Sequence, residues 1–133
     1  RSYRRDQLAG ICRAAKVGLV TPLRDGMNLV AKEYVAAQDE DDPGVLILSR
    51  FAGAAEQMRD AILVNPFARE EVADAILKAL TMPLEERQHR WRSLMKVVQD
   101  TDVSLWRDRY VRALQRPIEE MAAAPKRRRH TTA

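Results

Sequence analysis

The segment Val17 to Ala37 reads VGLVTPLRDGMNLVAKEYVAA and changes its pattern twice. Its first four residues, Val17 to Val20, form a short apolar and β-branched run, which predicts a buried strand. Thr21 to Gly26 contains a proline and a glycine and predicts a loop. A helix is expected from Asn28 to Ala37. The segment therefore predicts a strand, a loop and a helix in direct succession.

The rest of the chain continues this alternation. Two further apolar runs, Val45 to Leu48 and Ile62 to Val64, predict two more strands. The other predicted helices are Arg4 to Ala15, Ala54 to Arg59, Arg69 to Leu80, Met82 to Gln99 and Asp102 to Leu114. Helices that alternate with continuous apolar strands indicate an α/β fold, in which helices bury both faces of a parallel sheet. Three strands form a narrow sheet, so we expect further strands upstream.

Helical spacing and composition also predict which segments are buried. Leu8, Ile11, Cys12 and Ala15 are expected to form the apolar face of the first helix. The acidic and polar connection from Gln38 to Gly44 is expected at the surface, and Ser49 to Gly53 is expected to be a turn.

Composition and charge limit the possible functions. The chain has 133 residues, 46% of them apolar, and it begins with Arg1, so we expect one domain from a longer protein. Lys126 and Arg127 to Arg129 account for the whole excess of 23 Lys and Arg over 19 Asp and Glu. The body is therefore neutral, which argues against a basic face that binds nucleic acid. Residues 1–116 are expected to form the domain, and residues 117–133 a basic, disordered tail.

Other features of the sequence argue against a membrane protein, an internal disulfide and a metal site. No apolar run approaches the roughly 20 residues that span a bilayer, and the first residues do not pair basic residues with an apolar stretch as a signal peptide does, so we expect a cytoplasmic protein without membrane contact. The single cysteine, Cys12, cannot form an internal disulfide and is expected in the core. His89 and His130 have no partners at metal-ligand spacing, so no metal site is expected. Trp91 and Trp106 lie in the late predicted helices and are expected to have a packing role.

The loop after the first strand is the candidate site. Ligands of doubly wound sheets bind beyond the carboxyl ends of the strands, so Thr21 to Asn28 lies where a ligand would bind. Gly26 allows a sharp turn or a close approach of the backbone to a ligand. The first helical turn, Asn28 to Val30, offers unpaired amides of the kind that hold phosphate.

Two carboxylates accompany these amides. Glu33 projects from the same helix face as Leu29 and Val30, roughly 6 to 8 Å further along the axis, where it would suit a ribose diol. Asp25 is a candidate acceptor for sugar hydroxyls. Asp-Gly pairs are also common in turns, and Glu33 could simply be solvated. Spacing alone does not identify the ligand.

The segment Thr21 to Tyr34 resembles the signature of the bacterial UDP-forming trehalose-6-phosphate synthases. The resemblance continues in the same order through Val35 to Gln38, Leu48 to Ala55, Val64 to Pro66 and Ala79 to Arg87, and covers roughly Arg1 to Leu114. It implies the C-terminal part of the Rossmann-like donor domain of a GT-B glycosyltransferase. Such enzymes transfer glucose from UDP-glucose to glucose 6-phosphate with retention, by front-face displacement, without a metal or other cofactor.

The resemblance also implies a role for each matching residue. Asp25, the one residue assigned to catalysis, would bind hydroxyls of the donor glucose. The amides of Leu29 and Val30 would hold the diphosphate, Glu33 the ribose, and Tyr3 would lie near the uracil. The remaining residues expected to contact UDP-glucose are Gly26, Met27, Asn28, Ala31 and Lys32.

The same resemblance leaves parts of the enzyme outside these residues. The N-terminal domain, its glucose 6-phosphate residues and the family's phosphate-binding Arg and Lys would lie upstream. We therefore expect the fragment to be inactive alone, and a homo-oligomer is possible for the intact protein. Two alternatives stay open: a non-catalytic, regulatory module that binds sugar nucleotides, and a nucleic-acid-binding module that uses the basic tail.

Overall fold

The computed structural model describes residues 3–101, 107–108 and 110–115. The chain divides into two compact units, Arg1–Asp100 and Thr101–Ala133. The first unit contains the sheet and the candidate site. In the second, residues 107–108 and 110–115 are helical, which overlaps the helix predicted from Asp102 to Leu114 and passes its end by one residue. Trp106, His130 and the predicted tail lie outside the described residues.

Three parallel strands form the sheet of the first unit. They are β1 (Val17–Val20), β2 (Val45–Ser49) and β3 (Ile62–Val64), in the spatial order β1-β2-β3. Val20 pairs with Leu48 at the end of β1, and Ser49 pairs with Val64 at the end of β3. The carboxyl ends of all three strands therefore meet at one edge, as the alternating pattern predicts.

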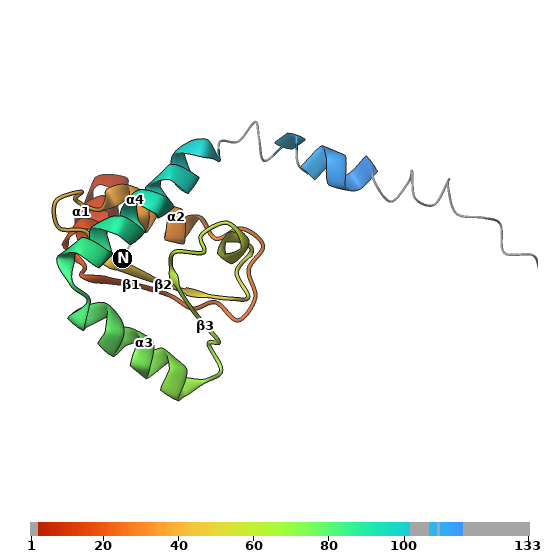
Figure 1. The fold of residues 1–133 in the computed structure, drawn as a ribbon. Coiled ribbons are helices and arrows are strands. Elements are labelled where there is room, and N and C mark those ends of the chain that lie inside the picture. Colours follow the sequence, from red (N-terminus) through yellow and green to blue (C-terminus); the bar gives the residue numbers. More distant parts are fainter. Residues whose placement is uncertain (1–2, 102–106, 109, 116–133) are drawn as a thin grey trace, which may run out of the picture. The chain divides into compact units, whose positions relative to one another are not determined.

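Helices cover both faces of this sheet. Figure 1 shows α1 (Arg5–Ala14), α2 (Leu29–Ala37) and α4 (Leu84–Asp100) on one side and α3 (Arg69–Thr81) on the other. A short 3₁₀ helix, η1 (Gly53–Glu56), connects β2 to β3. The predicted parallel α/β arrangement is confirmed.

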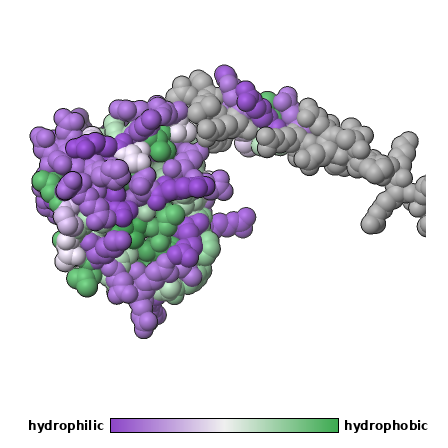
Figure 2. All heavy atoms as spheres, viewed as in Figure 1, coloured by the Kyte–Doolittle hydropathy of each residue, from purple (hydrophilic) through white to green (hydrophobic). Residues whose placement is uncertain are grey.

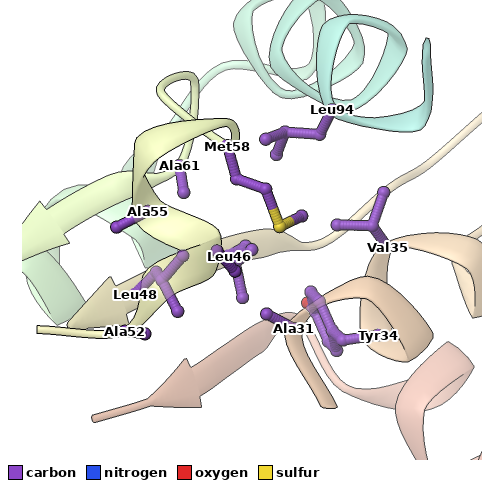
Figure 3. Close-up of a cluster of buried hydrophobic side chains, with 11 residues drawn as sticks. Ala31, Tyr34, Val35, Leu46, Leu48, Ala52, Ala55, Met58, Ala61 and Leu94 are labelled. Atoms are coloured by element: carbon purple, nitrogen blue, oxygen red, sulfur yellow. The ribbon is translucent and has the colours of Figure 1, made fainter. Parts of the chain in front are cut away.

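The larger core lies on the side of α2 and α4. Leu46 and Leu48 alternate with their neighbours along β2 and point to this side, as the two-residue period of a strand requires. Figure 3 shows Met58 reaching between Leu46, Val35 and Leu94, which joins three elements around one fully buried thioether. The Nε1 atom of Trp91 donates to the carbonyl of Val35 at 3.0 Å. The predicted packing role of Trp91 is confirmed.

The smaller core lies beneath α3. Val45 and Ile47 point to this side of β2 and meet Ala75 and Ala79, two small residues that let α3 lie close to the sheet. Val64 of β3 completes the contact and is fully buried. Because β2 is buried on both faces, its unbroken apolar run is explained.

Tyr34 locks α2 against the amino end of the sheet. Its hydroxyl donates to the carbonyl of Ala15 at 3.0 Å, and burial raises the pKa of the phenol well above its ordinary value. A Cβ atom added to Gly18 would lie 2.7 Å from the Tyr34 ring, and one added to Gly44 would lie 2.2 Å from its hydroxyl. The two glycines are therefore required by close contact with Tyr34.

Three predictions of detail were wrong. The segment expected as a helix from Ala54 to Arg59 forms only η1, because the connection closes into β3 at Ile62. Leu8 and Ile11 are exposed, because α1 packs mainly on α2 rather than on the sheet, and only the Cys12 and Ala15 side of α1 meets the core.

The third wrong prediction concerns Gln38, which is buried although its connection was expected at the surface. Its side chain donates to the carbonyl of Cys12 at 2.5 Å and accepts from the amide of Gly44 at 2.8 Å. These bonds satisfy a buried amide and tie α1 to the start of β2.

The sheet ends at β1 with apolar surface in contact with solvent. Leu19 of β1 is 48% exposed, and no other strand pairs with the outer edge of β1 in the described part of the chain. Figure 2 shows hydrophobic residues gathered in the middle of one face, framed by hydrophilic ones.

Candidate functional site

The loop from Thr21 to Asn28 lies at the carboxyl edge of the sheet, between β1 and α2. Val20 of β1 packs against the larger core, and Ala31 in the first turns of α2 is fully buried in it. Both ends of the loop are therefore held by packing, while its middle, at Leu23, Arg24 and Gly26, is exposed.

Asp25 organises this loop from within. Its Oδ1 atom accepts from the amides of Met27 and Asn28, both at 3.2 Å, and its Oδ2 atom accepts from the Asn28 side chain at 2.9 Å. The turn role that the sequence left open for Asp25 is thus present. Each carboxylate oxygen has a broad acceptor capacity, so these bonds leave room for a further donor.

Asn28 begins α2 in an unusual backbone conformation. Its φ of 63° lies in the left-handed region, which asparagine adopts more readily than most residues. Its side-chain oxygen accepts from the amide of Ala31 at 2.9 Å, which caps the third amide of the helix. One residue therefore turns the chain into the helix and satisfies one of its free donors.

The first two amides of α2 remain open. No group in the described part of the chain accepts a hydrogen bond from the amides of Leu29 or Val30, and the same holds for Gly26 in the loop. Leu29 and Val30 are also more than half exposed. Two adjacent, solvent-facing donors at a helix N-terminus form an anion-binding arrangement.

Glu33 lies one turn further along α2, beside a hollow between α1 and α2. The hollow has a volume of about 330 Å³, and Glu33 shares its lining with Arg5 and Leu8 of α1. The other lining residues are Ala9, Cys12, Ala36 and Ala37. Glu33 forms no ion pair within the described residues, so its carboxylate is free to accept hydrogen bonds from a ligand beside a largely apolar surface.

A second loop, the turn after β2 that contains Phe51, Ala52 and Gly53, supports the first loop. Its role was not predicted from the sequence. The amide of Asp25 donates to the carbonyl of Phe51 at 3.3 Å, and the amide of Gly53 donates to the carbonyl of Asp25 at 3.0 Å. Asp25 and Ala52 form an isolated parallel bridge. A signal was present, because the turn after β2 must reach the same edge of the sheet as the turn after β1.

The remaining predicted site residues lie at different depths. Tyr3 precedes α1 and is 55% exposed, and it does not line the hollow beside Glu33. Met27 and Lys32 are half-buried beside the open amides. Ala31 lies beneath the site, since its side chain is buried and its amide is bonded to Asn28. A direct ligand contact by Ala31 has the least support among the predicted contacts.

Neither a metal cluster nor a membrane helix occurs among the described residues. No three His, Cys, Asp or Glu side chains gather there in a group that could hold a metal ion. No helix in the same ranges is long and apolar enough to cross a bilayer. The absence of a metal from the reaction stays a prediction.

Curated relatives share this sequence over most of its length. The chain is 63% identical over 106 residues to a trehalose-6-phosphate synthase of Sinorhizobium fredii, which covers 80% of the chain and 23% of the relative. It is 55% identical over 114 residues to the synthase of an Enterobacter species, covering 86% of the chain and 24% of the relative. The chain thus spans about a quarter of the length of these relatives.

Solved structures show the same fold. A trehalose-phosphate synthase of Burkholderia xenovorans in complex with glucose-6-phosphate matches with a TM-score of 0.79 and 56% identity, over 86% of this chain and 26% of that one. The E. coli protein bound with UDP-2-fluoro glucose matches with a TM-score of 0.79 and 52% identity, over 86% and 25%. These matches confirm the predicted fold class and the predicted resemblance.

The family assignment rests on most of the chain. The model of glycosyltransferase family 20 matches residues 1–116, which include every element from α1 to α4 and the whole candidate site. We conclude that the chain belongs to glycosyltransferase family 20.

Proposed function

We propose that the chain forms the donor-binding part of a UDP-forming trehalose-6-phosphate synthase. The intact enzyme would transfer glucose from UDP-glucose to glucose 6-phosphate with retention of configuration. The proposal is supported by the names of the relatives and by the ligands named for two of the solved structures, glucose-6-phosphate and UDP-2-fluoro glucose.

One observation carries the proposal to this chain's own residues. The open amides of Leu29 and Val30 lie at the carboxyl edge of the sheet, and Glu33 follows them about 6 Å along the same helix. A nucleoside diphosphate presents the same two groups, a phosphate anion and a ribose diol, at comparable separation. We assign the diphosphate to the two amides and the diol to Glu33.

The hollow between α1 and α2 would take the base. Leu8 and the alanines of both helices form an apolar surface beside Glu33, and Arg5 adds donors at its rim. A flat heterocycle fits such a surface better than a sugar does, because it loses less hydration when it is buried. Tyr3 would approach the base from the start of α1.

The sugar would lie on the loop side of the amides. Gly26 is exposed, its amide is open, and a Cβ atom added to it would meet no atom within 4 Å. Its φ is not positive, so a tight turn does not require glycine there. The close approach of a ligand to the backbone would instead require glycine at this position. We assign the donor glucose to Gly26, Met27 and the remaining acceptor capacity of Asp25.

Catalysis in this proposal depends on positioning and on charge stabilisation. The helix N-terminus that holds the diphosphate would also stabilise the negative charge that develops as it leaves. Asp25 and Glu33 are binding groups here, unlike the acid and nucleophile of a glycosidase. Since this chain spans a quarter of the relatives, we expect it to transfer no glucose by itself. The proposal places the intact enzyme in the cytoplasm, in accord with a single, free cysteine.

The first prediction concerns Glu33. We expect Glu33→Ala to weaken UDP binding by about tenfold to 100-fold, because a charge-assisted hydrogen bond to the ribose is lost. The measurement is a titration of the isotopically labelled chain with UDP, followed by NMR at the amides of Leu29 and Val30. Glu40→Ala is the matched control, because it removes an equal charge from an exposed connection at the other end of α2.

The same substitution also has a test by activity. Residues 1–116 would replace the matching quarter of the Enterobacter synthase, and transfer of glucose to glucose 6-phosphate would be measured. An active chimera whose activity falls with Glu33→Ala and persists with Glu40→Ala supports the proposal. UDP affinity that Glu33→Ala leaves unchanged would contradict it.

A further inference from the structure

We propose that Gly53 is a positioning residue that sets the place of the donor sugar, and that it acts through the carbonyl of Gly26. This inference rests on the proposed function. It assigns to the turn after β2 a role in the affinity for UDP-glucose relative to UDP, although no residue of that turn is assigned to bind the nucleotide itself.

The two loops are joined by backbone contacts rather than by side chains. Asp25 donates its amide to Phe51 at 3.3 Å and accepts from the amide of Gly53 at 3.0 Å. These bonds flank the bridge between Asp25 and Ala52. The loop that carries Asp25 and Gly26 therefore extends the parallel pairing of β1 and β2 past the ends of both strands.

Gly53 brings the loops closer than any other residue would allow. A Cβ atom built on Gly53 would lie 1.9 Å from the carbonyl oxygen of Gly26 and 3.0 Å from its carbonyl carbon. Gly53 has no positive φ, so its backbone conformation is open to other residues. Glycine is therefore needed at position 53 because the backbone of Gly26 lies so close, and not because the turn requires it.

The loop of Gly26 would have to yield to any side chain at position 53. Ala52, Ala54 and Ala55 are all buried around Gly53, and the hydroxyl of Ser49 accepts from the amide of Phe51 at 3.1 Å. The second loop is thus held in the core on both sides of Gly53, at Ala52 and at Ala54. Gly26 is exposed, and the atom in conflict is backbone, so Gly26 must move by at least about 1 Å, a displacement that can cost about 100-fold in catalysis.

The displacement would affect the sugar half of the site more than the nucleotide half. Gly26 is followed by Met27 and Asn28, whose amides are both bonded to Asp25, so this turn moves together as far as the cap of α2. The body of α2 beyond the cap is held by Ala31 and Tyr34 in the core. The phosphate amides and Glu33 would therefore stay in place while the proposed glucose contacts shift.

The test compares two ligands in Gly53→Ala. In the chain itself, the dissociation constants of UDP and UDP-glucose would be measured by NMR titration. We expect the UDP-glucose constant to rise at least tenfold while the UDP constant changes less than twofold. In the chimera with the Enterobacter synthase, the KM for UDP-glucose should rise and kcat should fall, while inhibition by UDP is retained.

Two further variants complete the design. Gly10→Ala is the matched control, because a Cβ atom at this exposed position of α1 meets nothing within 4 Å, and both constants should stay unchanged. Ala52→Gly loosens the same bridge without adding an atom. Ala52→Gly should therefore weaken the binding of UDP-glucose and not that of UDP, and this can be measured even if Gly53→Ala does not fold.

The outcomes separate this inference from the proposed function. If the unaltered chain does not bind UDP at Leu29 and Val30, the proposed function fails. If the chain binds UDP but both substitutions weaken the binding of UDP and UDP-glucose equally, the role of Gly53 fails. It also fails if neither substitution weakens the binding of either ligand. A loss confined to UDP-glucose in both substituted chains supports it.

Discussion

At the scale of single residues, small side chains determine where backbone and rings meet. Gly18 lies beneath the ring of Tyr34, and Gly44 lies beside its hydroxyl. Tyr34 in turn bonds to Ala15, so these residues hold α2 over β1. A Cβ atom at either glycine would separate elements that the hydroxyl bond joins. Stability here depends on the absence of atoms as much as on contacts.

The prediction at this scale compares two glycines. We expect Gly18→Ala to lower the free energy of unfolding by about 1–3 kcal/mol, because the added methyl group would overlap the Tyr34 ring. We expect Gly10→Ala, at an open helical position, to raise it by about 0.5–1 kcal/mol, because alanine favours the helix. Urea unfolding of both substituted chains tests this, and equal effects would contradict the role of Tyr34.

Asp25 shows what can be known of one residue from sequence. Its place before a glycine in a loop indicated both a turn residue and a sugar acceptor. The three hydrogen bonds it accepts from Met27 and Asn28 confirm the turn role. The sugar role remains part of the proposal, because side-chain geometry within a loop does not follow from residue spacing.

At the scale of elements, the start of α2 is the most informative boundary. The sequence predicted the helix from Asn28, and the structure begins it at Leu29 with Asn28 as the cap. That difference of one residue matters, because the cap uses the amide of Ala31 and leaves those of Leu29 and Val30 open. The candidate phosphate site thus depends on which residue caps the helix.

The prediction at this scale substitutes Asn28. We expect Asn28→Ala to destabilise the chain by about 1–3 kcal/mol, because alanine loses the cap and adopts a φ of 63° less readily than asparagine does. Asn28→Gly should cost about 1 kcal/mol less than Asn28→Ala, because glycine accepts that conformation, whereas both substitutions lose the cap and the side-chain bond to Asp25. Urea unfolding measures both. If alanine and glycine are equivalent, the left-handed conformation does not contribute.

The prediction for α1 was right about the helix and wrong about its partner. The helical spacing of Leu8, Ile11 and Cys12 identified the element, but only Cys12 packs against the core. Leu8 instead lines the hollow beside Glu33. Periodicity identifies an apolar face without saying which surface covers it.

At the scale of the first unit, charged side chains join segments at the amino end of the sheet. Asp42 bonds to Lys16 before β1 at 2.5 Å and to Arg87 of α4 at 2.6 Å. The hydrogen bond from Lys16, and then that from Arg87, hold the pKa of the Asp42 carboxyl below its ordinary value. Arg87 also donates to the carbonyl of Pro43 at 2.6 Å. These contacts lie at the opposite end of the strands from the candidate site.

The prediction at this scale is a pH dependence. Since the pKa of Asp42 is lower in the folded chain than in the unfolded chain, its contribution is complete above the unfolded value and is lost as the pH falls through the folded one. We expect Asp42→Asn to be less stable than the unaltered chain at about pH 7 and to match it at about pH 2. Because Asp42 is exposed, the difference should be small and should shrink in high salt.

The measurement is urea unfolding at both pH values, with Asp74→Asn as the control. Asp74 is an exposed residue of α3 without an ion pair among the described residues. The difference in the free energy of unfolding between Asp74→Asn and the unaltered chain should therefore not depend on pH in this way. A constant difference between Asp42→Asn and the unaltered chain across the range would contradict the assignment.

The sequence by itself determined the order of the elements, the parallel sheet, the family and the loop from Thr21 to Asn28 as the candidate site. These follow from local periodicity, from motif residues that are adjacent in the chain, and from the rule that parallel strands present their carboxyl ends at one edge. Only the tertiary structure decided that Gly53 lies against the carbonyl of Gly26, that Gln38 is buried and that Glu33 faces a hollow. Each of these depends on contacts between segments far apart in sequence, and spacing along the chain carries no information about such contacts.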